Sequence, residues 1–247
     1  MLLGVIGCGR SQQWSPSGPA AELPVSSSSP ASGVSAQSAG SVSSGAVIAD
    51  AAVETDATVA EKRLRVHLVP VGEVSREMLE QVTAGLRDHA PVDPVLESAQ
   101  PLPREARTNE KDRYRAAKIL DWLATLAIDP DGKIIGISEI DLVERKGSIP
   151  NWGILGLGSL DGRCSVLSTW RMKRKWENGG APDWLVRERL WKTAIHELGH
   201  TLGLEHCPKV GCLMEDGHGT VKTTDRETAL CDDCAHKFLQ AIRRNSP

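Results

Sequence analysis

Three histidines, His196, His200 and His206, constrain this chain more than any other feature of its sequence. His196 and His200 are four residues apart, so a helix would place both imidazoles one turn apart on the same face. Gly203 can take a left-handed backbone that ends such a helix and lets the chain turn back. The pattern therefore predicts a helix that ends near Gly203, with His206 returning toward the other two imidazoles.

Three protein ligands leave the fourth position of a tetrahedral zinc ion open for water, as a catalytic zinc site requires. Zinc lowers the pKa of a bound water from 15.7 to about 7. Glu197, which follows His196 directly, would take the proton as this water attacks a peptide carbonyl. The alternative is three surface histidines on an amphipathic helix, but the glycine and third histidine in register make a chance match rarer. We predict His196, His200 and His206 as ligands of a catalytic zinc, and Glu197 as the general base.

Four cysteines follow the histidines, as the pairs Cys207/Cys212 and Cys231/Cys234. Two closely spaced pairs are typical of a closed structural zinc site with four thiolates. The alternative is two disulfides, which an oxidising compartment would favour. We predict the zinc site, and hence two zinc ions per chain. Met214, two residues after Cys212, is either an apolar floor beneath the catalytic site or an ordinary core residue.

Composition changes sharply along the chain. Residues 11–50 are rich in Ser, Ala, Gly and Pro and carry only two charged side chains, Glu22 and Asp50. Such a segment cannot bury enough apolar surface to offset the entropy lost on ordering. We therefore interpret residues 1–60 as a disordered leader and tether, and residues 61–247 as one folded domain. The net charge of −3 gives no basic face for nucleic acid, so we expect no such partner.

The first eight residues, MLLGVIGC, resemble the lipobox at the cleavage site of a bacterial lipoprotein signal. On this interpretation Cys8 is lipidated, and the tether holds the domain off a membrane. No positive residue precedes the apolar run, and the run is shorter than a normal signal core. We favour a lipoprotein anchored through Cys8, with a cytoplasmic protein as the alternative. The sequence makes no prediction of the oligomeric state.

Hydropathy patterns from residue 61 onward predict an α/β or α+β fold. Alternating or continuous apolar residues predict strands, and apolar stripes at helical spacing predict helices. The expected strands are 64–69, 133–140, 153–160 and 165–170, the last two joined by a hairpin turn at Asp161-Gly162. The expected helices are 75–89, 107–126 and 182–204.

The segment from His196 to His206, with the four cysteines and Met214, resembles the archaemetzincins, which are zinc peptidases of the metzincin clan. Residues 135–142 and 153–171 resemble the same family. The resemblance implies a metzincin-like mixed twisted sheet with an active-site helix and a zinc-stapled C-terminal subdomain. It also implies the same zinc ligands and general base, Met214 as the methionine turn, and a cleft strand along which an extended peptide could add.

Two positions depart from the family pattern. Leu230 stands where the family often has an aromatic residue, and the only tyrosine, Tyr114, does not follow the methionine turn as in several metzincins. The group that stabilises the oxyanion beside zinc is therefore left open. We expect Cys164 to be a buried core residue and His218 a solvated loop residue. The predicted function is a zinc metallopeptidase acting on peptide or protein substrates. The alternative is a catalytically silent, zinc-stabilised peptide-binding module on the same fold, against which the intact Glu197 argues.

Overall fold

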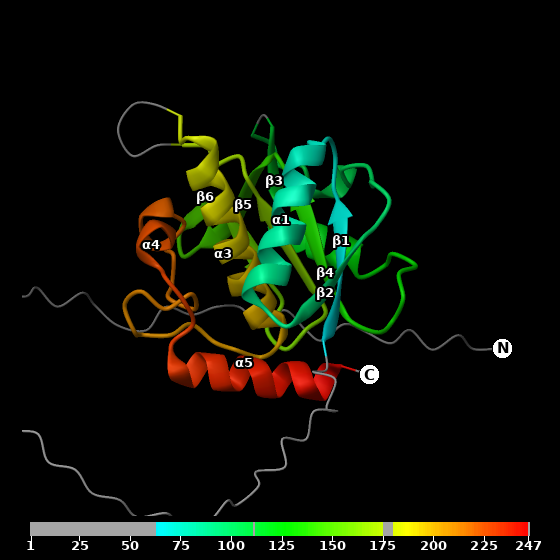
Figure 1. Cartoon of the computed structure of the whole chain (residues 1–247). Coiled ribbons are helices and arrows are strands. Elements are labelled where there is room, and N and C mark those ends of the chain that lie inside the picture. Colours follow the sequence, from blue (N-terminus) through cyan, green and yellow to red (C-terminus); the bar gives the residue numbers. More distant parts are fainter. Residues whose placement is uncertain (1–62, 111, 175–179, 247) are drawn as a thin grey trace, which may run out of the picture. The chain divides into compact units, whose positions relative to one another are not determined.

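The computed structural model describes residues 63–110, 112–174 and 180–246 (Figure 1). The predicted leader and tether, with Cys8, lie outside these residues, so the domain boundary and the membrane anchor stay predictions. Among the described residues, no helix combines the length and the apolar character needed to cross a membrane.

The main sheet has five strands in the order β2-β1-β4-β8-β7. The first four are parallel, and β7 is antiparallel to β8. β4 and β8 are buried along their whole length, as is usual for parallel strands with both faces covered. Pro94 is compatible with β2 because β2 is an edge strand. The bounds are β1 Leu64–Pro70, β2 Val92–Leu96, β4 Lys133–Ser138, β7 Gly156–Gly158 and β8 Cys164–Ser168.

Helices cover both faces of this sheet. Ile135 and Ile137 of β4 lie in one apolar cluster with residues of α1 (Arg76–His89), α3 (Asp183–Thr201) and α5 (Asp232–Asn245). Ile134, which points to the opposite face, packs in a second cluster with α2 (Ala116–Leu123). This alternation makes a sandwich of helices around the sheet, with the histidine motif on the α1–α3 face.

A second sheet has three strands in the order β3-β5-β6. It comprises β3 (Arg113–Arg115), β5 (Asp141–Lys146) and β6 (Ile149–Gly153). Its charged residues pair across the strands: Arg113 Nε donates to Asp141 at 3.0 Å, and Arg115 Nη1 donates to Glu144 at 3.0 Å. Two residues separate β6 from β7, so the second sheet leads directly into the edge strand of the main sheet.

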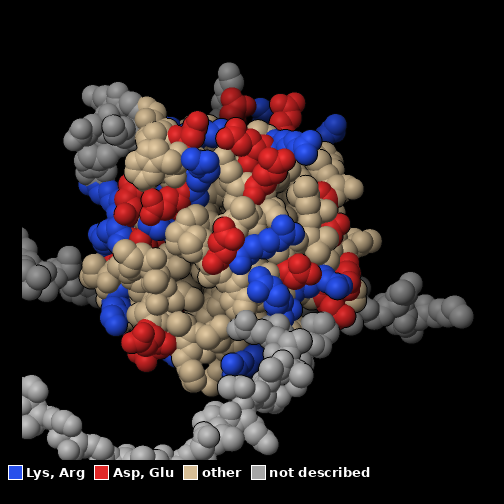
Figure 2. All heavy atoms as spheres, viewed as in Figure 1, with Lys and Arg blue, Asp and Glu red and all other residues tan. Residues whose placement is uncertain are grey.

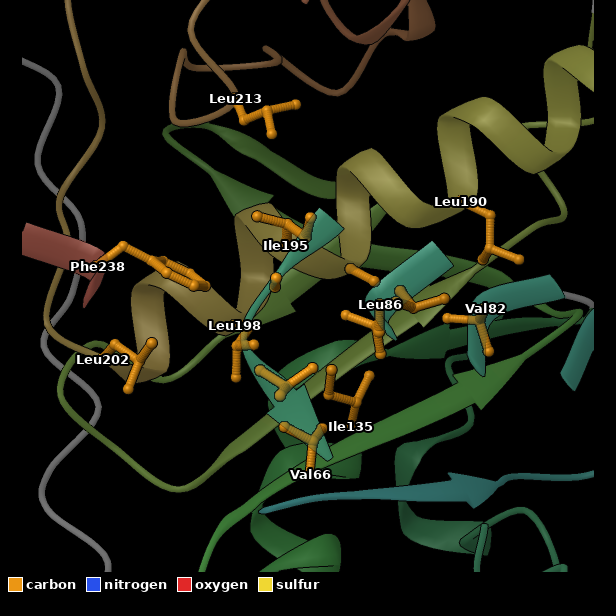
Figure 3. Packing of buried hydrophobic residues seen from close by; sticks show 14 of the residues in the cluster. Val66, Val82, Leu86, Ile135, Leu190, Ile195, Leu198, Leu202, Leu213 and Phe238 are labelled. Atoms are coloured by element: carbon orange, nitrogen blue, oxygen red, sulfur yellow. The ribbon is translucent and has the colours of Figure 1, made fainter. Parts of the chain in front are cut away.

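The C-terminal segment packs against α3 as well as against the sheet. It contains α4 (Val221–Arg226) and α5, which lies across the lower end of the fold in Figure 1. Phe238 of α5 is 2% exposed and lies beside Leu202, just after α3, in the cluster that Figure 3 shows. On the face drawn in Figure 2, acidic and basic side chains are interspersed.

The mixed α/β fold predicted from the sequence is confirmed. The structure also places strands at 64–70 and 133–138, helices at 76–89 and 183–201, and the β7–β8 hairpin near the expected positions. The helix expected over 107–126 is wrong in its first half, because Arg113–Arg115 form β3 and pair with β5. Strands β2, β5 and β6 and helices α4 and α5 were not expected from the sequence.

Candidate active site

The three predicted histidines come together at the C-terminal end of α3. One ring nitrogen from each of His196, His200 and His206 lies within 4.8 Å of the other two. Gly203 has a φ of +86°, and the Leu204 N–H donates to the Gly199 carbonyl at 2.9 Å. The chain therefore reverses at Gly203, as expected, and brings His206 back to the helix.

Backbone carbonyls orient the two helical imidazoles. His196 Nδ1 lies 2.6 Å from the Leu213 carbonyl, and His200 Nδ1 lies 2.8 Å from the Leu204 carbonyl. With Nδ1 as the donor on each ring, both Nε2 atoms carry a lone pair, and they lie 3.1 Å apart. Two facing lone pairs repel each other unless a cation lies between them, so this donor set fits a metal ion such as zinc.

Burial keeps these imidazoles neutral. Burial, and to a smaller extent the neighbouring histidines, lower the pKa of His196 to about 3 and that of His200 to about 4. The pKa of His206 is also lowered, mainly by burial. Neutral imidazole is the form that binds a metal, so the site is prepared for a cation at neutral pH.

Glu197 lies on the side of α3 that faces β7. Its side chain is buried, and burial raises the pKa of the carboxyl to about 8, although the Gly158 backbone N–H acts in the opposite direction. This carboxyl group is therefore held at the edge of the main sheet, one residue from His196 in the sequence.

The four predicted cysteines form a second cluster. Their Sγ atoms lie within 4.8 Å of one another, and those of Cys207 and Cys231 are 3.8 Å apart. None of the cysteines in the described part of the chain forms a disulfide. Cys231 is the N-cap residue of α5, where the backbone N–H of Cys234 is the main cause that lowers its pKa to about 7. Four converging sulfur atoms suit one tetrahedral metal site better than two separate disulfides.

One short segment links the two clusters. Cys212 belongs to the cysteine cluster, the Leu213 carbonyl accepts the His196 Nδ1 hydrogen bond, and Met214 is fully buried. A Cβ atom added at Gly199 would lie 2.5 Å from Met214 Sδ. Met214 therefore packs directly against the motif glycine, which agrees with a floor beneath the histidines.

Lys133 is a site residue that sequence reasoning missed. It is 8% exposed, and its Nζ donates to the Thr201 carbonyl at 2.8 Å and to the Gly162 carbonyl at 2.9 Å. These bonds join the last turn of α3 to the β7–β8 hairpin. A lysine at the start of an apolar strand gives no sequence signal for this role, because its two acceptors are distant along the chain.

Other expectations about single residues are also resolved. Cys164 is buried at 1% exposure, and His218 is an exposed loop residue whose Nδ1 lies 3.1 Å from Asp216 Oδ2. Tyr114 packs with the second core cluster, on the sheet face opposite α3. Tyr114 is therefore not part of the histidine site.

Comparisons with known proteins agree on one family. Residues 66–240 match peptidase family M54. The archaemetzincin of Halobacterium salinarum is 38% identical over 176 residues, covering 69% of this chain and 97% of that protein. The archaemetzincin of Haloarcula marismortui is 33% identical over 180 residues, covering 71% of this chain and 100% of that protein.

Solved structures share the fold. The archaemetzincin of Archaeoglobus fulgidus, solved in complex with malonate, gives a TM-score of 0.58 at 25% identity and covers 70% of this chain and 99% of that chain. The archaemetzincin of Methanopyrus kandleri gives a TM-score of 0.59 at 23% identity, with coverages of 74% and 95%. Together with the family match over more than half of the sequence, these relatives show that the chain belongs to the archaemetzincins, peptidase family M54.

Proposed function

We propose that this archaemetzincin is a metzincin-type zinc peptidase in which His196, His200 and His206 hold the catalytic zinc. The observation that carries the proposal is the pair of Nε2 lone pairs, which the Leu213 and Leu204 carbonyls orient toward each other. Zinc bound there would act as a Lewis acid that polarises a peptide carbonyl and lowers the pKa of a water.

Glu197 is the general base of this proposal. It takes the proton of the attacking water and delivers it to the leaving amine. Its position between the two helical histidines in sequence, and its buried carboxyl beside β7, support this role. The substrate is a peptide or protein. The outer strand β7 lies next to α3 and is available for an extended peptide to pair with.

The four cysteines are proposed to hold a second, structural zinc. Cys231 and Cys234 belong to the start of α5, whereas Cys207 and Cys212 follow the histidine motif. A metal bound by all four would fix the segment that contains Leu213 and Met214. This site supports the catalytic one through structure and takes no part in the chemistry.

Peptide-library cleavage with mass-spectrometric readout tests the function. Glu197→Ala should lower kcat/KM by about 10²- to 10⁴-fold and keep both zinc ions, because none of the proposed ligands is changed. Glu205→Ala is the matched control, since Glu205 is exposed and lies just after the helix. A Glu197→Ala enzyme as active as the parent would refute the general-base role.

Metal analysis under reducing conditions tests the two zinc sites. We expect two zinc ions per chain, and a count of one would refute the four-thiolate site. Chelation should abolish cleavage. A parent protein that binds two zinc ions but leaves the whole library uncut at neutral pH would instead support the silent peptide-binding module.

A further inference from the structure

Two glycines of β7 face the general base. A Cβ atom built at Gly156 would lie 2.6 Å from Glu197 Oε1, 2.8 Å from its Cγ and 2.9 Å from its Cδ. A Cβ atom at Gly158 would lie 2.6 Å from the Glu197 carbonyl oxygen and 2.9 Å from His200 Cβ. Real Cβ atoms essentially never approach other heavy atoms this closely. The Glu197 side chain therefore has its place only because position 156 lacks a side chain, and α3 can approach β7 this closely only because position 158 lacks one.

The backbone N–H and C=O groups of the same two glycines point away from β8, as the hydrogen bonds between β7 and β8 show. Ser168 N donates to Leu155 O at 2.9 Å, and Ser159 N donates to Cys164 O at 3.0 Å. In the antiparallel β7–β8 ladder, hydrogen-bonded pairs alternate with pairs whose backbone groups point away from the partner strand. Gly156 and Gly158 are therefore the residues whose N–H and C=O groups lie on the free edge, and the Gly158 N–H acts on the Glu197 carboxyl group by lowering its pKa against the effect of burial.

We propose that Gly156 and Gly158 are positioning residues that form a side-chain-free seat for the Glu197 carboxylate, and so set where the general base lies in the active site. The proposal rests on the proposed role of Glu197. The two glycines act differently. Gly156 leaves room for the end of the side chain, whereas Gly158 leaves room for the α3 backbone and supplies a backbone N–H.

The size of the displacement follows from the distances. Ordinary van der Waals contact begins at 3.4 Å, so an alanine at position 156 must push Oε1 outward by about 0.8 Å, from 2.6 to 3.4 Å. Cγ and Cδ, at 2.8 and 2.9 Å, must move as well, by about 0.6 and 0.5 Å. All three atoms belong to one side chain and none to the backbone, so Gly156→Ala should fold and bind zinc. Because misplacing a catalytic group by about 1 Å can cost about 10²-fold, we expect kcat/KM to fall between about 10- and 100-fold. The loss should lie mainly in kcat.

The experiment is a double-mutant cycle on the full-length, zinc-loaded enzyme. Parent, Gly156→Ala, Glu197→Ala and the double variant are compared for kcat, KM, zinc content and Tm, using one peptide that the library identifies. In the Glu197→Ala background no carboxyl group remains to be displaced, so adding Gly156→Ala should change the residual activity by less than about 3-fold. Gly180→Ala is the matched control, since its nearest neighbour is the Lys173 carbonyl oxygen at 3.9 Å.

Gly158→Ala provides a second test, in which Tm is measured in the parent and in the Glu197→Ala background. Its two tightest contacts, with the Glu197 carbonyl oxygen at 2.6 Å and His200 Cβ at 2.9 Å, remain in Glu197→Ala, which removes only the looser contact with Oε2 at 3.3 Å. Most of its loss of Tm should therefore persist in that background. Any loss of Tm in Gly156→Ala should disappear there.

The outcomes separate the two proposals. The positioning role of the two glycines would be refuted if Gly156→Ala left kcat unchanged. It would also be refuted if Gly156→Ala lowered kcat equally in the parent and in Glu197→Ala. Full activity in Glu197→Ala would overturn the general-base role instead.

Discussion

The buried ammonium of Lys133 should stabilise the end of the active-site helix strongly, and Lys133→Met tests this. Methionine keeps most of the apolar stem but leaves the Thr201 and Gly162 carbonyls without this donor. Hydrogen bonds to a charged group contribute about 1.5–3 kcal/mol each, and a cation at a helix C-terminus contributes up to about 1 kcal/mol. We expect the free energy of unfolding to fall by about 3–7 kcal/mol, and Tm to fall by at least about 6 °C.

Urea unfolding followed by circular dichroism measures this loss, at a fixed excess of zinc because bound metal raises the apparent stability. Lys118→Met is the control. Lys118 is exposed and its contact with Asp121 is 3.7 Å long, so its removal should change stability by less than about 0.5 kcal/mol. A loss below about 1 kcal/mol in Lys133→Met would refute the view that this lysine holds the helix to the β7–β8 hairpin.

Two further substitutions test buried contacts near the site. Gly199→Ala places a methyl group 2.5 Å from Met214 Sδ. The destabilisation from overpacking, about 1–3 kcal/mol, should outweigh the gain in helix propensity of about 1 kcal/mol. A variant that is more stable than the parent in thermal unfolding would contradict this. Glu227 is 3% exposed, and burial raises its pKa to about 8 in the folded state. Its folded pKa exceeds the unfolded value, so the protein should lose stability as pH rises toward 8, by about 2 kcal/mol between pH 6 and 8. Glu227→Gln should lack this part of the loss and keep the part due to Glu197, whose pKa is also raised to about 8. A parent and variant that differ by a constant amount from pH 6 to 9 would disprove the assignment.

The histidine site was predictable because its spacing is local. A separation of four residues puts two imidazoles on one helical face whatever the surrounding fold, and Gly203 gives its own turn signal. The groups that orient these residues were not predictable. Lys133, Gly158 and the Leu213 carbonyl reach the site from separate parts of the chain, and the topology of the sheet alone decides which of them meet there.

The unpredicted elements have physical explanations of the same kind. β5 carries two acidic residues, Asp141 and Glu144, so its hydropathy pattern does not indicate a strand. In the structure these charges are paired with Arg113 and Arg115 of β3. The same pairing explains why the expected helix begins late, at Ala116. α5 differs, because its buried Cys234, Phe238, Ala241 and Ile242 follow helical spacing, so its apolar stripe was visible in the sequence.

The parallel order of the main sheet also bears on how fast the protein folds. β1 pairs with β4 through Val66 and Lys133, and β4 pairs with β8 through Ile134 and Cys164. Each pairing closes a long loop, and the entropy lost in closing it is offset only after the strand contacts have formed. An isolated helix such as α3 relaxes within about a microsecond, whereas chains dominated by distant pairings fold in milliseconds to seconds. Assembly of the sheet therefore sets the folding rate. We therefore expect the helix that carries the histidines to form and melt many times before β7 and Lys133 contact it.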